Sequence, residues 1–193
     1  LKQALDRIAF RPEALEMRIG ASGTKLFAIP MRDVAERRFG APYYHVHRAD
    51  LIAVLSDALR ERAPRAVRLK KDLVAFEQTG GGVLATFADD TRANGDVLIG
   101  ADGIHSRVRE RLFGAEKPRF TGNVAWRVVV PATAKLKELV PPTACIWVGP
   151  GRHAVTYYLR GGELINFVGV VERSDWQNEC WTERGERRNS PPT

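Results

Sequence analysis

The chain has 193 residues, of which 44% are hydrophobic and 27% are charged, as in globular proteins with an apolar core. No apolar run approaches about 18 residues, so neither a membrane-spanning helix nor a membrane partner is expected. Lys and Arg number 30 against 23 Asp and Glu, which gives a formal net charge of +7. Such a charge is compatible with nucleic-acid binding. The Arg residues are scattered along the whole length, however, which favours a solvated basic surface and no nucleic-acid partner.

Side chains that form disulfides or bind metals are sparse in this chain. Cys145 and Cys180 lie far apart in a sequence without a visible signal peptide, which indicates free thiols and a cytoplasmic location. His45 and His47 are close enough on an expected strand to share one face. No third ligand lies near them in the sequence, so no metal site is expected.

The N-terminal part of the chain predicts short elements in succession. Apolar spacing indicates a helical segment over residues 1–8, strands over 14–19, 25–30 and 43–47, and a loop over 37–40. Residues 49–62 carry apolar side chains at helical spacing with polar residues opposite them, which predicts an amphipathic helix. Pro64 follows the expected end of this helix.

The next segment predicts short strands with tight turns. Strands are expected over 66–69, 73–77 and 83–87, with Gly80–Gly82 as a hairpin turn and 89–91 as another turn. Val97–Ile99 is a short apolar run, which indicates a buried strand. Gly100–Gly103 then turns the chain, and Ser106 can cap a following helix that ends at Gly114.

The pattern changes after Pro118 to longer, alternating strands. They are expected over 124–130, 144–148, 153–159 and 164–171. Alternation of apolar and polar residues suits an antiparallel sheet with one wet face. We therefore place a domain boundary near Phe120, and we expect residues 176–193 to form a polar tail.

Three segments resemble a known family. The string from Asp96 to Arg109 resembles the DG motif of FAD-dependent aromatic-ring monooxygenases, the flavoprotein hydroxylases that include salicylate hydroxylases. The segment from Tyr43 to Leu51 is similar to the family's strand that ends in an Arg and opens a helix. The segment from Phe120 to Arg127 resembles the start of the family's substrate-domain sheet. The order and spacing of the three segments also match the family.

The resemblance implies a fold class and a domain organisation. The class is α/β with α+β character: an incomplete glutathione-reductase-type FAD-binding domain plus an antiparallel substrate-domain sheet. The expected domains are a partial FAD-binding domain over 1–119, a partial substrate-binding sheet over 120–175 and the tail over 176–193. Residues 14–30 are expected to contribute strands to the substrate sheet.

The resemblance also implies that parts of the family's pattern lie outside this sequence. The family's Gly-x-Gly-x-x-Gly loop, which holds the ADP half of FAD, does not occur here, and neither does the family's later Gly-Asp segment. The chain starts at Leu1, inside what resembles the helix after the Gly-rich region. We therefore expect a fragment that is inactive alone. A non-catalytic remnant or interaction protein from a truncated gene is the alternative.

The resemblance assigns FAD contacts to Arg48, Asp102 and Gly103. A planar guanidinium suits phosphate oxygens, and a turn at the end of a strand offers N–H groups to phosphate and a carboxylate to ribose hydroxyls. Gly103 would let the backbone approach the ligand closely. The alternatives are an Asp102 that only caps the next helix and an Arg48 that is a surface residue.

The resemblance assigns catalysis to His153 and Tyr157, which lie on one face of an expected strand. In the family this sheet lines the pocket of a small aromatic substrate, here expected to be salicylate-like. A His or Tyr in that pocket can hydrogen-bond a phenol and help to remove its proton. NAD(P)H is the expected co-substrate, and the oligomeric state stays open. The alternative interpretation of both residues is ordinary sheet side chains.

Overall fold

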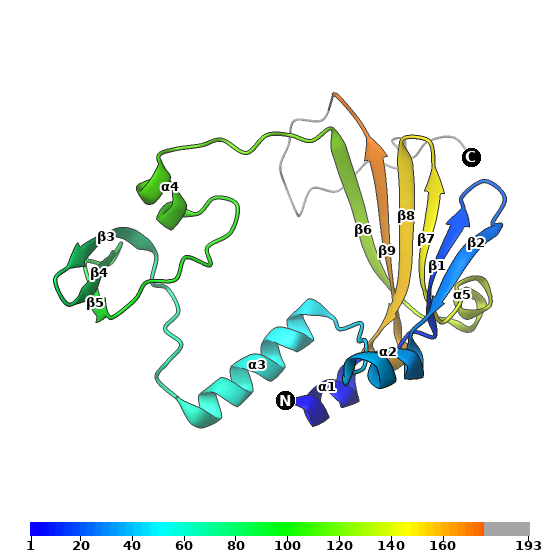
Figure 1. The fold of residues 1–193 in the computed structure, drawn as a ribbon, viewed down its shortest axis with the longest axis horizontal. Coiled ribbons are helices and arrows are strands. Elements are labelled where there is room, and N and C mark those ends of the chain that lie inside the picture. The colour runs from blue at the N-terminus through cyan, green and yellow to red at the C-terminus, as the bar shows by residue number, and fades with distance from the viewer. Residues whose placement is uncertain (176–193) are drawn as a thin grey trace. The chain divides into compact units, whose positions relative to one another are not determined.

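The computed structural model describes residues 1–175, which form two compact units (Figure 1). The first unit comprises Leu1–Ala4 and Arg48–Arg119, and the second comprises Leu5–His47 and the described residues from Phe120 onward. No helix within the described residues is long and apolar enough to cross a membrane.

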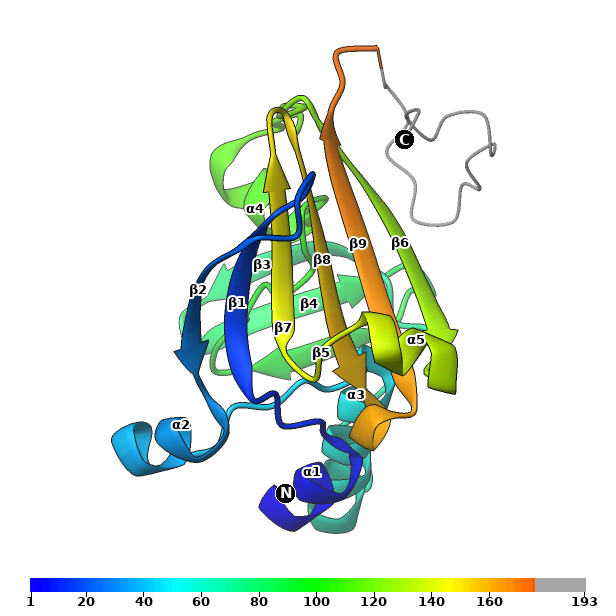
Figure 2. The ribbon, with the colours of Figure 1, turned by 90° about the vertical axis from the view of Figure 1, so that its right-hand side faces the viewer.

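A six-stranded sheet forms the body of the second unit. Its strands are β2 (Lys25–Pro30), β1 (Ala14–Ile19), β7 (Ala144–Gly149), β8 (Arg152–Leu159), β9 (Leu164–Glu172) and β6 (Asn123–Pro131), side by side in that order (Figure 2). Neighbouring strands are antiparallel except β1 and β7, which are parallel. The predictions of all six strands are therefore confirmed, and the sheet as a whole is mixed.

The helices of the second unit are short. They are α2 (Arg32–Phe39), α5 (Ala134–Leu139) and the 3-10 turn η1 (Arg160–Gly162), while α1 (Lys2–Ile8) begins in the first unit. The prediction of a loop over 37–40 is wrong, because α2 continues to Phe39 and Gly40 closes it in the left-handed conformation. Only Ala35 of this helix is buried, so its apolar pattern is too weak to read from the sequence.

The core of the second unit lies on the central strands. Cys145, Tyr158, Leu159 and Ile165 are at most 4% exposed. The Tyr158 hydroxyl donates a hydrogen bond of 2.8 Å to the carbonyl of Val140, so this polar group is satisfied inside the core. Cys145 is a free thiol, as predicted, and Cys180 lies outside the described residues.

The first unit holds the predicted amphipathic helix and a small sheet. These elements are α3 (Arg48–Arg62), the antiparallel strands β3 (Leu73–Thr79), β4 (Gly82–Phe87) and β5 (Arg92–Gly95), and α4 (Arg107–Phe113). The hairpin between β3 and β4 is confirmed, and so are the Ser106 cap and the end of α4 at Gly114. Strand β5 was not predicted, because a four-residue strand of polar and small residues carries no apolar alternation.

Three predicted strands are absent or reduced. Residues 97–99 form no strand, and Val97 and Ile99 are 74% and 83% exposed. Residues 66–69 also form no strand, and 43–47 contributes only the isolated bridge between His45 and Phe10. A strand exists only where a neighbour takes up its hydrogen bonds, and β5 is the last strand that pairs in the small sheet.

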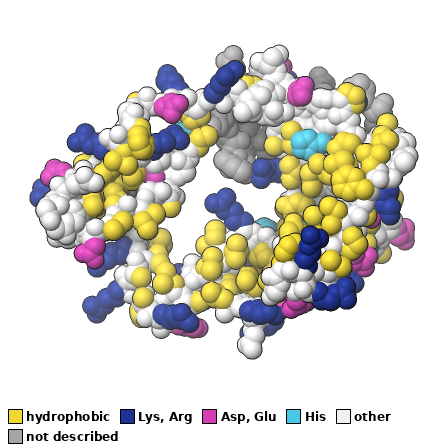
Figure 3. Space-filling model, viewed as in Figure 1, with side chains coloured by type: hydrophobic (Ala, Val, Ile, Leu, Met, Phe, Trp, Pro, Cys, Tyr) yellow, Lys and Arg dark blue, Asp and Glu magenta, His cyan; other side chains and the backbone are white. Residues whose placement is uncertain are grey.

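Helix α3 leaves its apolar stripe uncovered within the described residues. Ile52, Leu55 and Leu59 are between 41% and 52% exposed, and hydrophobic side chains line this helix in Figure 3. The spacing is that of a helix that packs against a core. The sequence therefore predicts the helix correctly, whereas its apolar face has no buried residue in this structure.

We expect Gly82→Ala to destabilise the small sheet by about 2 kcal/mol, the scale of a strained backbone position. The φ angle of Gly82 is +148°, and a Cβ there would lie 2.3 Å from the carbonyl oxygen of Gly95. Hydrogen exchange of the β3–β5 amides would measure the loss. Gly81→Ala is the matched control, because a Cβ at Gly81 would meet nothing within 4 Å. Equal protection in both variants would contradict the expectation.

Candidate functional site

Strand β8 places His153 and Tyr157 on one face of the six-stranded sheet. Val155 lies between them on the same face, because alternate residues of a strand point the same way. The strand register adds the apolar side chains of Ile146 and Val148 from β7, and of Val168 and Val170 from β9. We call this surface the His153 face. It carries two potential acid–base groups on a largely apolar surface.

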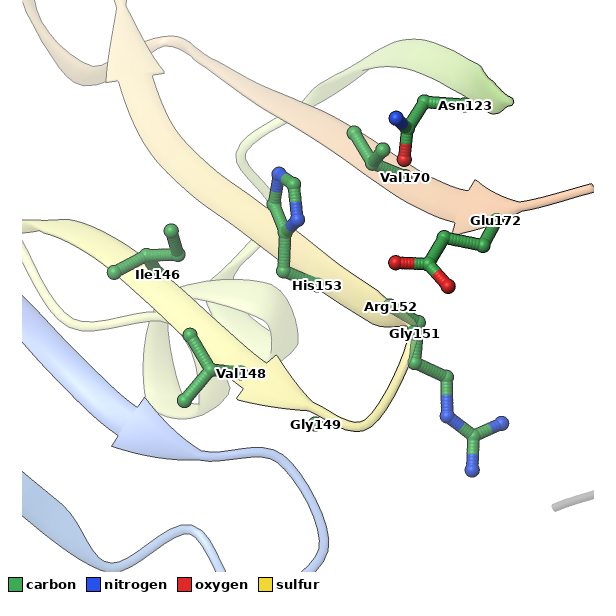
Figure 4. Close-up of a pocket in the computed structure, with 9 residues that line it drawn as sticks. All are labelled: Asn123, Ile146, Val148, Gly149, Gly151, Arg152, His153, Val170 and Glu172. Atoms are coloured by element: carbon green, nitrogen blue, oxygen red, sulfur yellow. The ribbon is translucent and has the colours of Figure 1, made fainter. Parts of the chain in front are cut away.

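His153 lines a shallow pocket of about 240 Å³ on this face (Figure 4). Its lining consists of Asn123, Ile146, Val148, Gly149, Gly151, Arg152, His153, Val170 and Glu172. Figure 4 shows the Arg152 side chain extending away from the other labelled side chains. The pocket thus combines apolar walls with an imidazole, an amide and a carboxylate, which suits a small ligand with polar substituents.

Tyr157 lies against a histidine that the sequence did not assign to the site. The ring of His45 is 4.9 Å from the ring of Tyr157, between centroids. Phe10 and Tyr43 also contact this imidazole, at 6.3 and 5.4 Å. The two predicted catalytic residues therefore have different surroundings, since His153 lines an open pocket and Tyr157 packs on the buried ring of His45.

Burial lowers the pKa of His45 from 6.5 to about 4, and a hydrogen bond with the Tyr158 backbone opposes that effect only partly. The side chain is 8% exposed. A charged imidazole would lose its hydration there, so the neutral form is favoured. His45 is therefore neutral at physiological pH.

We expect the second unit to lose stability as the pH falls from about 6.5 toward about 4, the interval between the unfolded and folded pKa of His45. In that interval the unfolded state binds the proton and the folded state does not, so stability is complete above it. At 1.36 kcal/mol per pKa unit, the loss over the whole interval is about 3 kcal/mol. Urea unfolding of the chain and of His45→Phe at pH 7 and pH 4.5 would measure it. The same pH dependence in both proteins would refute it.

The DG segment of the first unit is a helix-capping loop in this structure. The Asp102 carboxylate accepts hydrogen bonds from the Ser106 hydroxyl and from the backbone N–H groups of Arg107 and Val108, the latter two at 2.8 and 3.3 Å. The bond from Ser106 is the main cause that lowers the Asp102 pKa. Ser106 accepts in turn from Arg109 N–H at 3.0 Å. Asp102 therefore caps α4, as the alternative interpretation of this residue expects. Capping is compatible with ligand binding, since a carboxylate can accept further hydrogen bonds.

A second pocket, of about 370 Å³, surrounds Asp102. It is lined by Lys71, Asp72, Leu73, residues 98–101, Asp102, His105, Arg107 and Val108. Gly103 has a φ of +79° and no atom within 4 Å of the position of a Cβ, so its backbone is open to a ligand. The two cations of the lining are ion-paired, Lys71 with Asp89 and Arg107 with Asp72 at 3.7 Å. The Asp102 carboxylate and the open backbone at Gly103 suit the ribose hydroxyls and the phosphate of a dinucleotide. The residues present therefore fit part of FAD.

Arg48 is the first residue of α3. Positive charge at a helix N-terminus is unfavourable by the helix dipole, which is the reason to expect an anionic ligand for this side chain. Arg48, Asp102 and Gly103 belong to the first unit, whereas His153 and Tyr157 belong to the second. The predicted cofactor residues and the predicted catalytic residues thus fall in different units, and Arg48 is not among the residues that line the pocket around Asp102.

Sequence reasoning missed further polar residues on the His153 face. Asn166 pairs with Tyr157 across β8 and β9, and it is 8% exposed. Arg127 pairs with Val168, which places it on this face as well. Glu172 contributes the carboxylate of the pocket. Strand alternation was the available signal, but it gives the relative faces only within a strand, and the register between strands is needed to combine them.

Comparison with known proteins supports one family. The sequence pattern of the family described as FAD binding domain matches residues 16–186. The 3-amino-4-hydroxybenzoate 2-monooxygenase PtmB3 of Streptomyces platensis is 35% identical over 182 residues, which are 94% of this chain and 45% of that protein. The 6-hydroxynicotinate 3-monooxygenase of Pseudomonas fluorescens is 36% identical over 187 residues, 95% of this chain and 48% of the relative. The chain thus spans about half the length of these curated relatives.

Solved structures agree on the fold. Klebsiella pneumoniae HpxO complexed with FAD and uric acid superposes with a TM-score of 0.77 at 24% identity, over 92% of this chain and 44% of HpxO. A salicylate hydroxylase substrate complex gives a TM-score of 0.67 at 25% identity, over 95% of this chain and 49% of the other. The sequence pattern of the FAD binding domain, which matches residues 16–186, includes the DG segment and the strands of the His153 face. The chain therefore belongs to the FAD-binding domain family of flavoproteins that includes the aromatic-ring monooxygenases.

Proposed function

We propose that this chain forms the substrate sheet and part of the cofactor site of an FAD-dependent monooxygenase that uses NAD(P)H to hydroxylate a small, salicylate-like aromatic compound. The observation that carries the proposal is the His153 face. It presents an imidazole and a phenol above apolar side chains of β7 and β9. An aromatic ring can lie on the apolar part, while the polar groups hydrogen-bond its hydroxyl substituent.

The residues of this chain have distinct tasks in that reaction. His153 accepts or shares the proton of the substrate hydroxyl, which raises the electron density of the ring. Tyr157 orients the same substituent by a hydrogen bond. Arg48 and the backbone at Gly103 hold phosphate and ribose parts of FAD, and FAD supplies the oxygen-activating chemistry when it is bound.

The chain covers 45% and 48% of the lengths of two relatives that act on hydroxylated aromatic acids. We propose that the isolated polypeptide binds FAD weakly and is inactive alone, because it lacks a Gly-x-Gly-x-x-Gly loop, whose close backbone approach and following helix N-terminus bind the pyrophosphate. Equilibrium dialysis checks this point, and a sub-micromolar dissociation constant for FAD would overturn it.

A hybrid protein tests the activity. This chain would replace the matching segment of the Pseudomonas fluorescens 6-hydroxynicotinate 3-monooxygenase, which is 36% identical over 187 residues. We expect the hybrid to purify with bound FAD and to oxidise NAD(P)H when hydroxybenzoates or hydroxypyridines are added, with formation of hydroxylated product. A folded, flavin-loaded hybrid that hydroxylates no member of such a panel would favour a non-catalytic remnant.

A further inference from the structure

His45 is fixed by its backbone at the end of strand β8. Its N–H donates to the Phe10 carbonyl at 2.8 Å, and its carbonyl accepts from the Phe10 N–H at 2.9 Å. The Phe10 ring in turn packs on Tyr158, with 5.1 Å between ring centroids. The segment around Phe10, which is remote from His45 in the sequence, therefore holds His45 beside β8, the strand that carries the proposed catalytic residues.

The imidazole of His45 is a direct neighbour of Tyr157. The two rings are 4.9 Å apart at an interplanar angle of 57°, and Tyr43 also contacts the imidazole, edge to face, at 5.4 Å. His45 is 8% exposed. Rotation of the Tyr157 ring away from this contact would open a buried surface, so the contact restricts the positions of Tyr157.

The hydrogen bonds of His45 indicate its tautomer. The bond with the Tyr158 backbone raises the imidazole pKa, so the ring donates and the carbonyl accepts. Nδ1 has no hydrogen-bond partner among the described residues, which leaves Nε2 as the donor. A buried lone pair at Nδ1 therefore lies on a ring that contacts Tyr157.

A second buried polar atom belongs to the residue that pairs with Tyr157 on the neighbouring strand. Asn166 is the cross-strand partner of Tyr157. Its Nδ2 has no hydrogen-bond partner among residues 1–175. Buried polar groups without partners are rare in cores. The surroundings of Tyr157 thus differ from ordinary apolar packing.

We propose that His45 is a positioning residue for Tyr157: its neutral imidazole, anchored by Nε2–H to the Tyr158 carbonyl, holds the Tyr157 ring in one orientation. The role of Tyr157 itself rests on the proposed function. His45 lies outside the predicted site. In this proposal it acts through Tyr157 and does not contact the substrate.

The chain itself allows the first test. In a sample with ¹⁵N-labelled histidine at pH 7, we expect His45 to show a protonated Nε2, an unprotonated Nδ1 and nuclear Overhauser contacts to the Tyr157 ring. His45→Phe should shift the Tyr157 ring signals, whereas Tyr43→Phe, which keeps an aromatic ring beside His45, should leave them in place. A protonated Nδ1, or Tyr157 signals unchanged in His45→Phe, would overturn the proposal.

A double-mutant cycle in the hybrid enzyme is the second test. We expect His45→Phe to lower kcat roughly 10-fold, on the scale of coupled contacting residues, and to leave KM within about 2-fold. The loss should vanish in a Tyr157→Phe background, and His45→Gln, which restores an N–H donor, should recover part of it. Should His45→Phe unfold the hybrid, His45→Gln carries the same cycle with Tyr157→Phe.

The outcomes separate the inference from the proposed function. Losses from His45→Phe and Tyr157→Phe that multiply independently would show that His45 does not act through Tyr157, and the inference would be wrong. A Tyr157→Phe enzyme with full activity would instead refute the catalytic role of Tyr157. The histidine spectra would still report whether His45 fixes the ring.

Discussion

We expect His153→Ala to reduce substrate hydroxylation by the hybrid enzyme about 100-fold, at the lower end of the contribution of general acid–base groups. The imidazole lines the open pocket on the His153 face, where no other described imidazole contributes to the lining. Tyr157→Phe should lower turnover less, by about 10-fold, because it removes a hydroxyl and keeps the ring packed on His45. Both variants should retain FAD, since both residues lie in the second unit.

Product formation and NAD(P)H oxidation, measured together, would check this expectation. NAD(P)H oxidation that continues while product formation falls would show that the substrate is bound in the wrong orientation. Val155→Ala is a useful control, because Val155 lies on the same face between the two residues and carries no polar group. If His153→Ala and Val155→Ala had equal activity, His153 would be an ordinary sheet residue.

The second large effect concerns FAD. We expect Arg48→Ala and Asp102→Ala each to weaken FAD binding by the hybrid about 10- to 100-fold, since a hydrogen bond to a charged group contributes roughly 1.5–3 kcal/mol. Arg48→Lys should recover only part of the loss, because an ammonium lacks the planar pair of donors that matches a phosphate. Flavin fluorescence titration would measure these affinities.

The cap geometry requires a separate control for Asp102. Its carboxylate also accepts from Ser106 and from two backbone N–H groups at the start of α4, so Asp102→Ala removes a helix cap as well. Ser106→Ala disturbs the same cap and leaves the Asp102 carboxylate in place. We expect Ser106→Ala to keep its FAD affinity. If it weakened FAD as much as Asp102→Ala, the effect of Asp102 would be structural.

Elements that depend on local pattern could be predicted from the sequence. The alternation in 153–159 and 164–171 predicts two of the strands of the His153 face, and helical spacing predicts α3. The Gly80–Gly82 turn and the Ser106 cap also follow from local chemistry. Each of these elements is specified by residues close together in the chain, which is why the pattern was sufficient.

The local sequence pattern could not decide whether Val97–Ile99 forms a strand. Its apolar character predicts burial, but the segment is exposed and pairs with no described strand. The apolar stripe of α3 shows the same disagreement, with Leu55 47% exposed. Apolar pattern reports what a segment can bury, whereas pairing and burial require a partner surface, and no element of the first unit covers these segments.

By itself, the sequence determined the six strands of the large sheet, helix α3, the family and the position of His153 and Tyr157 on one strand face, because these depend on short periodicity and on motif residues. Only the tertiary structure decided that β1 joins the sheet parallel to β7, that Asp102 caps α4, and that His45 and Asn166 are neighbours of Tyr157. Asn166 meets Tyr157 through the register between β8 and β9, and His45 meets it through a bridge to Phe10. Such contacts join residues far apart in the chain, and their register depends on packing that no local pattern encodes.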